Sequence, residues 1–139
     1  MKKTWIEKRD CEKSFKIKVI DKPFSDMPKG SKMLIVTPQI IDNYLRNIPF
    51  GKSIAFGGMR KDLASKYNAN HTCPVTTGIF LRIVSEAAYQ EFTLGKKHNE
   101  ITPFWRVVTQ HMNLAKKLEC GEAFIVKQRR QENLDEEIN

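Results

Sequence analysis

Apolar side chains recur with helical spacing in three stretches of the chain between residues 37 and 92. The first stretch begins at Thr37 and Pro38, which suit an N-cap and a first helical position, and it ends at Pro49. One apolar stripe runs along it, formed by Ile40, Ile41, Tyr44, Leu45 and Ile48. The pattern predicts an amphipathic helix that buries this stripe.

Two more helices are expected further along the chain. The first covers about residues 58–67, and its outer face carries Arg60, Lys61 and Lys66. The second opens at Pro74 and extends to about residue 92. Its apolar face is formed by Ile79, Phe80, Ile83, Val84, Ala87 and Ala88. Both helices therefore have one side suited to a common core.

The flanking segments predict strands and a charged tail. Phe15, Ile17 and Val19 alternate with lysines, which is typical of a half-buried or edge strand. Residues 105–108 also favour a strand, and residues 122–136 favour a highly charged helix. Three helices followed by a strand form the outline of a winged helix-turn-helix, whose helix after the turn enters the major groove of DNA. The predicted fold class is therefore mainly α with a small β component.

Charge divides the chain into three parts. The net charge is +8, to which residues 1–32 contribute +5, residues 33–118 contribute +6 and residues 119–139 contribute −3. We expect a basic N-terminal extension with one strand over 1–32, the winged-helix domain over 33–118, and a charged C-terminal helix or tail over 119–139. A basic body suits a polyanionic partner, although the same charge also suits solubility alone.

The cysteines and histidines predict neither a disulfide nor a metal site. Cys11, Cys73 and Cys120 are odd in number and far apart, and His98 and His111 lack the spacing of zinc ligands. No cofactor is expected. The chain has no run of about 18 apolar residues, and its basic N-terminus precedes no signal-like stretch. We therefore expect a cytoplasmic protein that is not inserted in a membrane.

Short motifs at two places in the chain resemble those of a known family. They are Ile48-Pro49-Phe50-Gly51-Lys52, Phe56-Gly57 and Leu63-Ala64 at the first place, and Pro103-Phe104-Trp105-Arg106-Val107-Val108 at the second. In order and approximate spacing they resemble the C-terminal DNA-binding domain of the O6-alkylguanine-DNA alkyltransferases, which carries Ile-Pro-x-Gly, Thr-Tyr-Gly, Leu-Ala and Pro-Cys-His-Arg-Val. The chain is also similar to small bacterial proteins grouped with this family, whose Thr-Cys-Pro-x-Thr-Thr-Gly-Ile-Phe and Thr-Pro-Tyr-Trp-Arg match residues 72–80 and 102–106.

The departures from the family pattern affect the chemistry. Phe104 stands at the place of the nucleophilic cysteine and Trp105 at that of the activating histidine, so the thiolate and the base that alkyl transfer needs are both missing. Phe56 replaces the tyrosine that supports a flipped nucleotide. No arginine stands at residues 77–78, where the family's base-stack arginine falls, and Arg82 lies one turn later. The chain therefore resembles the alkyltransferase-like branch, which lacks the reactive cysteine and binds alkylated DNA without chemistry, although that branch keeps the histidine.

The resemblance and the charge pattern imply a set of contacts to DNA. The expected contacts are Lys52, Arg60, Lys61, Lys66, Thr76, Thr77, Arg82 and Arg106. The base-pocket position is assigned to Phe56, Phe104 and Trp105. Structural roles stay open for several of them: Arg106 as a brace, the two threonines as helix caps, and the aromatic pair as ordinary packing. Because the two new rings add bulk, we predict that Phe104 is buried and that no guanine-sized pocket remains beside it, unless small residues opposite make room: Gly57, Gly58 and Gly78.

Three functional hypotheses follow. The leading one is a non-catalytic module that binds duplex DNA mainly through phosphates, with or without sensing of an alkylated base. The second is a protein-interaction module that binds a partner or a second copy. The positions of Arg60, Lys66 and Arg82 separate these two, because cations that do not share a face with the third helix weaken the DNA hypothesis. The third is an alkyltransferase that uses Cys73, near a helix N-terminus; we predict no alkyl transfer.

Overall fold

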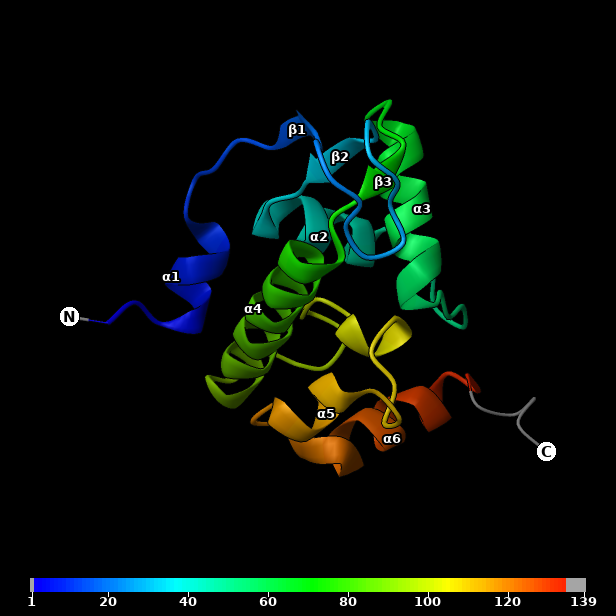
Figure 1. Cartoon of the computed structure of the whole chain (residues 1–139). Coiled ribbons are helices and arrows are strands. Elements are labelled where there is room, and N and C mark those ends of the chain that lie inside the picture. The colour runs from blue at the N-terminus through cyan, green and yellow to red at the C-terminus, as the bar shows by residue number, and fades with distance from the viewer. Residues whose placement is uncertain (1, 135–139) are drawn as a thin grey trace.

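Six α-helices and a three-stranded sheet make up the part of the chain that the computed structural model describes, residues 2–134 (Figure 1). In chain order the elements are α1 (Trp5–Asp10), β1 (Lys16–Val19), β2 (Lys32–Ile35), α2 (Pro38–Arg46), α3 (Phe56–Lys66), β3 (His71–Thr72), α4 (Pro74–Thr93), the 3-10 helix η1 (Phe104–Arg106), α5 (Asn113–Lys117) and α6 (Gly121–Gln131). The expected class, mainly α with a small β component, is confirmed.

The three predicted helices of the body are present as α2, α3 and α4. The Thr37 hydroxyl accepts a hydrogen bond from the Ile40 amide at 3.2 Å, so Thr37 caps α2 as expected. The buried face of α2 meets that of α4, which crosses the middle of the molecule in Figure 1. Fully buried core residues on these two helices include Ile41, Leu45, Leu81 and Val84. No helix within residues 2–134 has both the length and the apolar character needed to cross a membrane.

The small sheet joins the N-terminal residues to the body. Its strand order is β1-β2-β3, with β1 antiparallel and β3 parallel to β2. The predicted strand at residues 15–19 is therefore present as β1, but all of its side chains are exposed, because β1 is an edge strand without a covering layer. A second small core of Ile20, Met27, Met33 and Cys73 lies under the β1–β2 loop. Strand β2 runs across the boundary expected between residues 32 and 33.

The N-terminal residues 5–10 form a helix that was not predicted, α1, and it packs against α4. Thr4 and Glu7 form a reciprocal capping box that starts α1. The Ile6 amide donates to Gln90 Oε1 at 3.1 Å, and the Arg9 guanidinium pairs with the Glu91 carboxylate at 2.8 Å. Both side chains of this ion pair are about nine-tenths buried. The N-terminal extension is thus fastened along the helix that was expected to recognise DNA.

The prediction of a strand at residues 105–108 is wrong. The 3-10 helix η1 occupies this place, because local bonds close the backbone: the amides of Val107 and Val108 both donate to the Phe104 carbonyl, at 3.1 and 2.8 Å. In the described residues the chain after α4 continues through η1 into α5 and α6, so the strand of the winged-helix outline is missing there. Helix α6 matches the predicted charged helix up to residue 131; residues 135 and 136 lie outside the described residues.

Candidate functional site

The segment with Phe104 and Trp105 is packed inside an aromatic cluster. Phe104 has no exposed surface and Trp105 is 1% exposed, so the predicted burial of Phe104 is confirmed. The Phe104 ring lies 5.3 Å from the Trp105 ring and 6.1 Å from that of Phe124 on α6, measured between centroids. Phe124 therefore packs against the two rings, a contact that the sequence did not predict.

The pockets found on residues 2–134 agree with a filled motif. None of five pockets there is lined by Phe104 or Phe56. Trp105 does line one of them, a pocket of about 220 Å³ that it shares with Phe50, Pro103 and Arg106. Phe56 packs half-buried against the main core. Gly57 and Gly78 were candidates for making room, but no other group lies within 4 Å of a Cβ built on either of them. A Cβ built on Gly58, the third candidate, would meet the Ile54 side chain at 3.3 Å. None of the three glycines therefore lies against the rings of Phe104 and Trp105.

Glu132 joins the two segments that carry the family resemblance. Its carboxylate accepts hydrogen bonds from the Trp105 indole at 2.8 Å, from Arg106 Nε at 2.8 Å and Nη2 at 3.1 Å, and from the Gly51 amide at 3.0 Å. Arg106 also donates to the Ile48 carbonyl at 2.6 Å. The Ile-Pro-x-Gly segment and the Phe-Trp-Arg segment are thus tied together through one buried carboxylate.

The electrostatics of this tie favour an ionised Glu132. Burial alone raises the pKa of Glu132. The hydrogen bonds from Arg106, Trp105 and Gly51, with the charge of Arg106, outweigh burial and hold the pKa of Glu132 below its ordinary value of 4.5. The Arg106 side chain is only 14% exposed and is fully engaged in this tie. Arg106 is therefore an internal brace and is not available to a phosphate in this arrangement.

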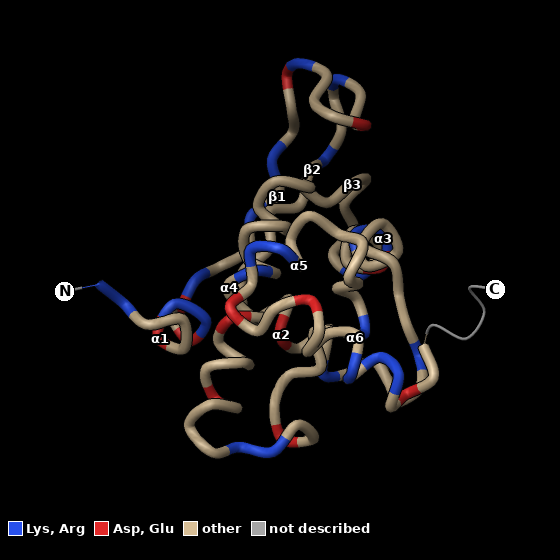
Figure 2. The backbone as a smooth tube through the Cα atoms, turned by 90° about the horizontal axis from the view of Figure 1, so that it is seen from below, with Lys and Arg blue, Asp and Glu red and all other residues tan. Residues whose placement is uncertain are grey.

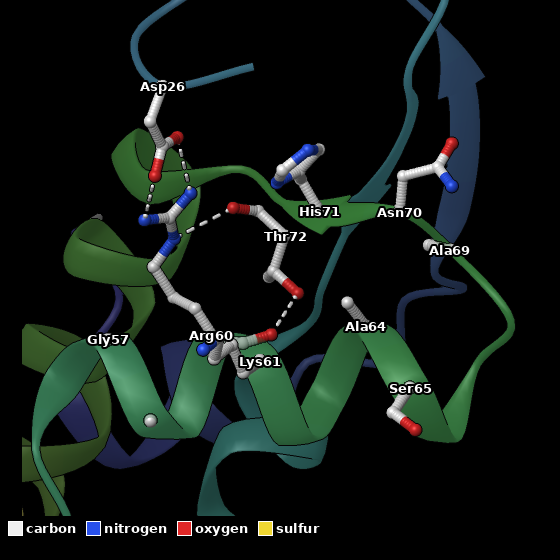
Figure 3. A pocket seen from close by; sticks show the side chains of 11 residues that line it. Asp26, Gly57, Arg60, Lys61, Ala64, Ser65, Ala69, Asn70, His71 and Thr72 are labelled. Atoms are coloured by element: carbon white, nitrogen blue, oxygen red, sulfur yellow. Dashed lines mark hydrogen bonds and ion pairs between the residues drawn. The ribbon is translucent and has the colours of Figure 1, made fainter. Parts of the chain in front are cut away.

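A polar groove lies on the other side of the body, between α3, β3 and the β1–β2 loop (Figure 3). Its volume is about 760 Å³. Three residues with basic side chains line it, Arg60, Lys61 and His71, and Asp26 is its one acidic lining residue. Much of the remaining lining is small or amide-bearing: Gly57, Gly58, Ala64, Ser65, Ala69 and Asn70. The groove is therefore suited in charge to a small anionic group.

The other predicted contacts on α4 are Thr76, Thr77 and Arg82, and their surroundings differ. Thr77 is fully buried and its hydroxyl donates to the Cys73 carbonyl at 2.6 Å, so it cannot meet a phosphate. Thr76 is half-buried, and its hydroxyl oxygen is buried without a hydrogen-bond partner in the described part of the chain. Arg82 lies 5.5 Å from the Trp5 ring and 3.5 Å from the Glu86 carboxylate, between α1 and α5. Only the first turns of α4 present an open face.

The expected cations do not share one face with α4. Arg60 turns towards β3, Lys66 lines a groove between α2 and α3, and Arg82 lies under α1. Lysines and arginines are spread over all sides of the backbone in Figure 2. This arrangement counts against a DNA contact centred on α4 and in favour of the interaction hypothesis. Lys52, Lys61 and Lys66 are nevertheless exposed, at the start, middle and end of the α3 region.

Cys73 does not present a reactive thiol at the surface. It is 5% exposed and belongs to the small core under the β1–β2 loop. Its position before Pro74 is as the sequence suggested, at the N-cap of α4, but it makes no side-chain capping bond. No group of three or more histidine, cysteine, aspartate and glutamate side chains within residues 2–134 is arranged to hold a metal ion.

Three residues of the tie and the groove were not predicted from the sequence: Glu132, Asp26 and His71. Glu132 is 26 residues beyond Arg106, in a segment that reads only as a charged helix. Asp26 lies in a loop between Pro23 and Pro28, and His71 lies in the two-residue strand β3; neither position carries a sequence motif. No family model matches the chain, and no curated protein and no solved structure is significantly similar to it.

Proposed function

We propose that the protein is a non-catalytic module that binds duplex DNA through phosphates, with α3 and the groove beside it as the contact surface. The observation that carries the proposal is a group of three exposed lysines at α3, together with the groove beside this helix. Lys52 lies four residues before the helix, Lys61 lines the groove, and Lys66 lies on the side that faces α2. Phosphate contacts of this kind supply most of the sequence-independent affinity for DNA.

The buried aromatic motif argues for binding without base extrusion. A flipped base needs a pocket that stacks it and reads its edge. Phe104, Trp105 and Phe124 fill the corresponding space with their own rings. Loss of the nucleophile and its base removes alkyl transfer at this motif. Binding by shape and phosphate contact remains.

A salt titration tests this proposal. Fluorescence anisotropy with a short labelled duplex would be measured at increasing KCl concentration. Three lysines that each neutralise a phosphate give a log–log slope of about −3, since the slope is about −0.9 per phosphate. The Lys61→Gln variant should reduce the slope by about 1, whereas Lys97→Gln, on the exposed loop after α4, should leave it unchanged. No binding at low salt would reject the proposal.

A protein-interaction module is the second candidate, and a specific observation favours it. Val75 and Ile79, one helical turn apart at the start of α4, are each 53% exposed and present an apolar face where a recognition helix would carry polar groups. The scatter of Arg60, Lys66 and Arg82 supports the same candidate. Sedimentation at rising protein concentration tests the case of a second copy: self-association that Ile79→Asp abolishes, without DNA binding, would favour this candidate over the first.

A further inference from the structure

The Arg60 guanidinium is held in place by hydrogen bonds between Arg60 and Thr72 of β3. Arg60 Nε donates to the Thr72 carbonyl at 2.8 Å, and the Thr72 hydroxyl donates back to the Arg60 carbonyl at 2.7 Å. The side chain is only 15% exposed. Because these bonds use Nε, the two terminal nitrogens remain directed into the groove beside α3, as Figure 3 shows. The guanidinium is therefore preorganised to receive an acceptor with two oxygens.

In the free protein that acceptor is Asp26. Arg60 Nη1 and Nη2 donate to the two carboxylate oxygens of Asp26 at 3.3 and 3.2 Å. Asp26 is attached to the exposed loop between β1 and β2, and its side chain is 59% exposed. The hydrogen bond from Arg60 is the main reason that the pKa of Asp26 lies below its ordinary value, and the charge of His71 adds to it. An exposed carboxylate of this kind is readily exchanged for another anion.

The rest of the groove offers more donors than one carboxylate uses. Lys61 and His71 line the same groove as the guanidinium, and Asn70 lies next to His71 on the groove wall. A phosphate group presents more oxygens than a carboxylate and carries more negative charge, so it has acceptors left for groove donors after it pairs with Arg60. A volume of about 760 Å³ leaves room for it beside the small residues of α3.

We propose that this groove contains a site for one phosphate group, held by Arg60 with Lys61 and His71, and that Asp26 occupies the place of the phosphate in the free protein. The proposal deepens the proposed function, on which it rests where the phosphate belongs to DNA. Asp26 then acts as an internal competitor. If its carboxylate occupies Arg60 about nine-tenths of the time, removal of its charge tightens phosphate binding about tenfold.

The test uses the full chain, inorganic phosphate as one probe and a short duplex as the other. Binding of phosphate is followed by chemical shifts of the groove amides in two-dimensional NMR spectra, and binding of the duplex by anisotropy. Asp26→Asn should tighten phosphate binding about tenfold. Asp21→Asn, an exposed residue of the same loop, is the matched control and should change nothing. Arg60→Lys keeps the charge but loses the two-pronged geometry, and should abolish the gain from Asp26→Asn.

The outcomes separate the two proposals. Tighter binding of both probes to Asp26→Asn supports a site for DNA phosphate, and tighter binding of inorganic phosphate alone supports a site for a free phosphate. Phosphate binding without any duplex binding supports the site while the proposed function fails. Unchanged affinities for both probes in Asp26→Asn, or shifts that do not involve residues 57–72, overturn the site, whether or not the duplex binds through other lysines. Unfolding curves of the variants exclude a loss of structure as the cause.

Discussion

Replacement of Glu132 by glutamine removes the charge at the centre of the buried tie between the two motif segments. The neutral amide keeps one acceptor oxygen but places an amine among donors that now face it from Trp105, Arg106 and the Gly51 amide. Arg106 is left without its carboxylate while its side chain stays 14% exposed. Removal of one partner from a buried ion pair typically costs about 3–5 kcal/mol, and we expect about 3 kcal/mol here because one acceptor survives.

Urea denaturation monitored by the fluorescence of the two tryptophans, of which Trp105 is buried, measures this loss. With a slope of about 2 kcal/mol per molar urea, the midpoint should fall by about 1.5 M. Glu122→Gln, an exposed position on the same helix α6, is the control and should leave the midpoint unchanged. A Glu132→Gln midpoint within about 0.3 M of the wild type would refute the argument that this carboxylate holds the segments together.

The unfolding free energies of the wild type and of Glu132→Gln should depend differently on pH. Because the pKa of Glu132 is lowered in the folded state, its stabilisation is fully present above its ordinary value of 4.5 and is lost as the pH falls through the folded-state value. The unfolding free energy of the wild type should therefore fall more steeply below pH 4.5 than that of Glu132→Gln. Parallel curves for the two proteins would show that the pKa of Glu132 does not change on folding.

Three further results are expected. Phe104→Ala should lower the free energy of unfolding by about 3–5 kcal/mol in urea, because it empties a fully buried ring position, and a loss below about 1 kcal/mol would contradict the packing. Iodoacetamide should label Cys11 first, as measured by peptide mass spectrometry, because Cys73 is buried and burial raises the pKa of Cys120 to about 12. Early labelling of Cys73 would support the hypothesis of a reactive thiol at that residue. Arg9→Met should cost about 2 kcal/mol in urea, since a buried carboxylate partner remains, and unchanged stability would mean that α1 is not anchored by this pair.

Local sequence signals predicted the helices that have strong ends. Thr37 and Pro38 mark the start of α2, and Pro74 marks that of α4, because capping and the fixed backbone of proline act within a few residues. The capping box of Thr4 and Glu7 was an equally local signal for α1 that went unused. Strands β2 and β3 were missed because short strands are defined by their partners, which lie far away along the chain.

The candidate site was predictable only in part, because several of its contacts join residues that lie far apart in the chain. Burial of Phe104 followed from its size at a crowded position. Its stacking on Phe124 and the tie through Glu132 depend on where α6 folds back, which no local pattern specifies. The strand expected at residues 105–108 failed because an apolar run of that length also suits a buried turn. The charge of the chain was visible in the sequence, but the pairing of Arg60 with Asp26 required the fold.

The central claim is that this protein binds duplex DNA through phosphates without extruding a base. The most direct test compares its dissociation constants for two duplexes of identical sequence, one with a central guanine and one with O6-methylguanine, at the same low salt concentration. Because Phe104 is fully buried against Phe124 and leaves no place beside it for an extruded base, we expect both duplexes to bind with constants within about twofold of each other. A preference of about tenfold or more for the alkylated duplex, or no binding to either, would contradict the claim.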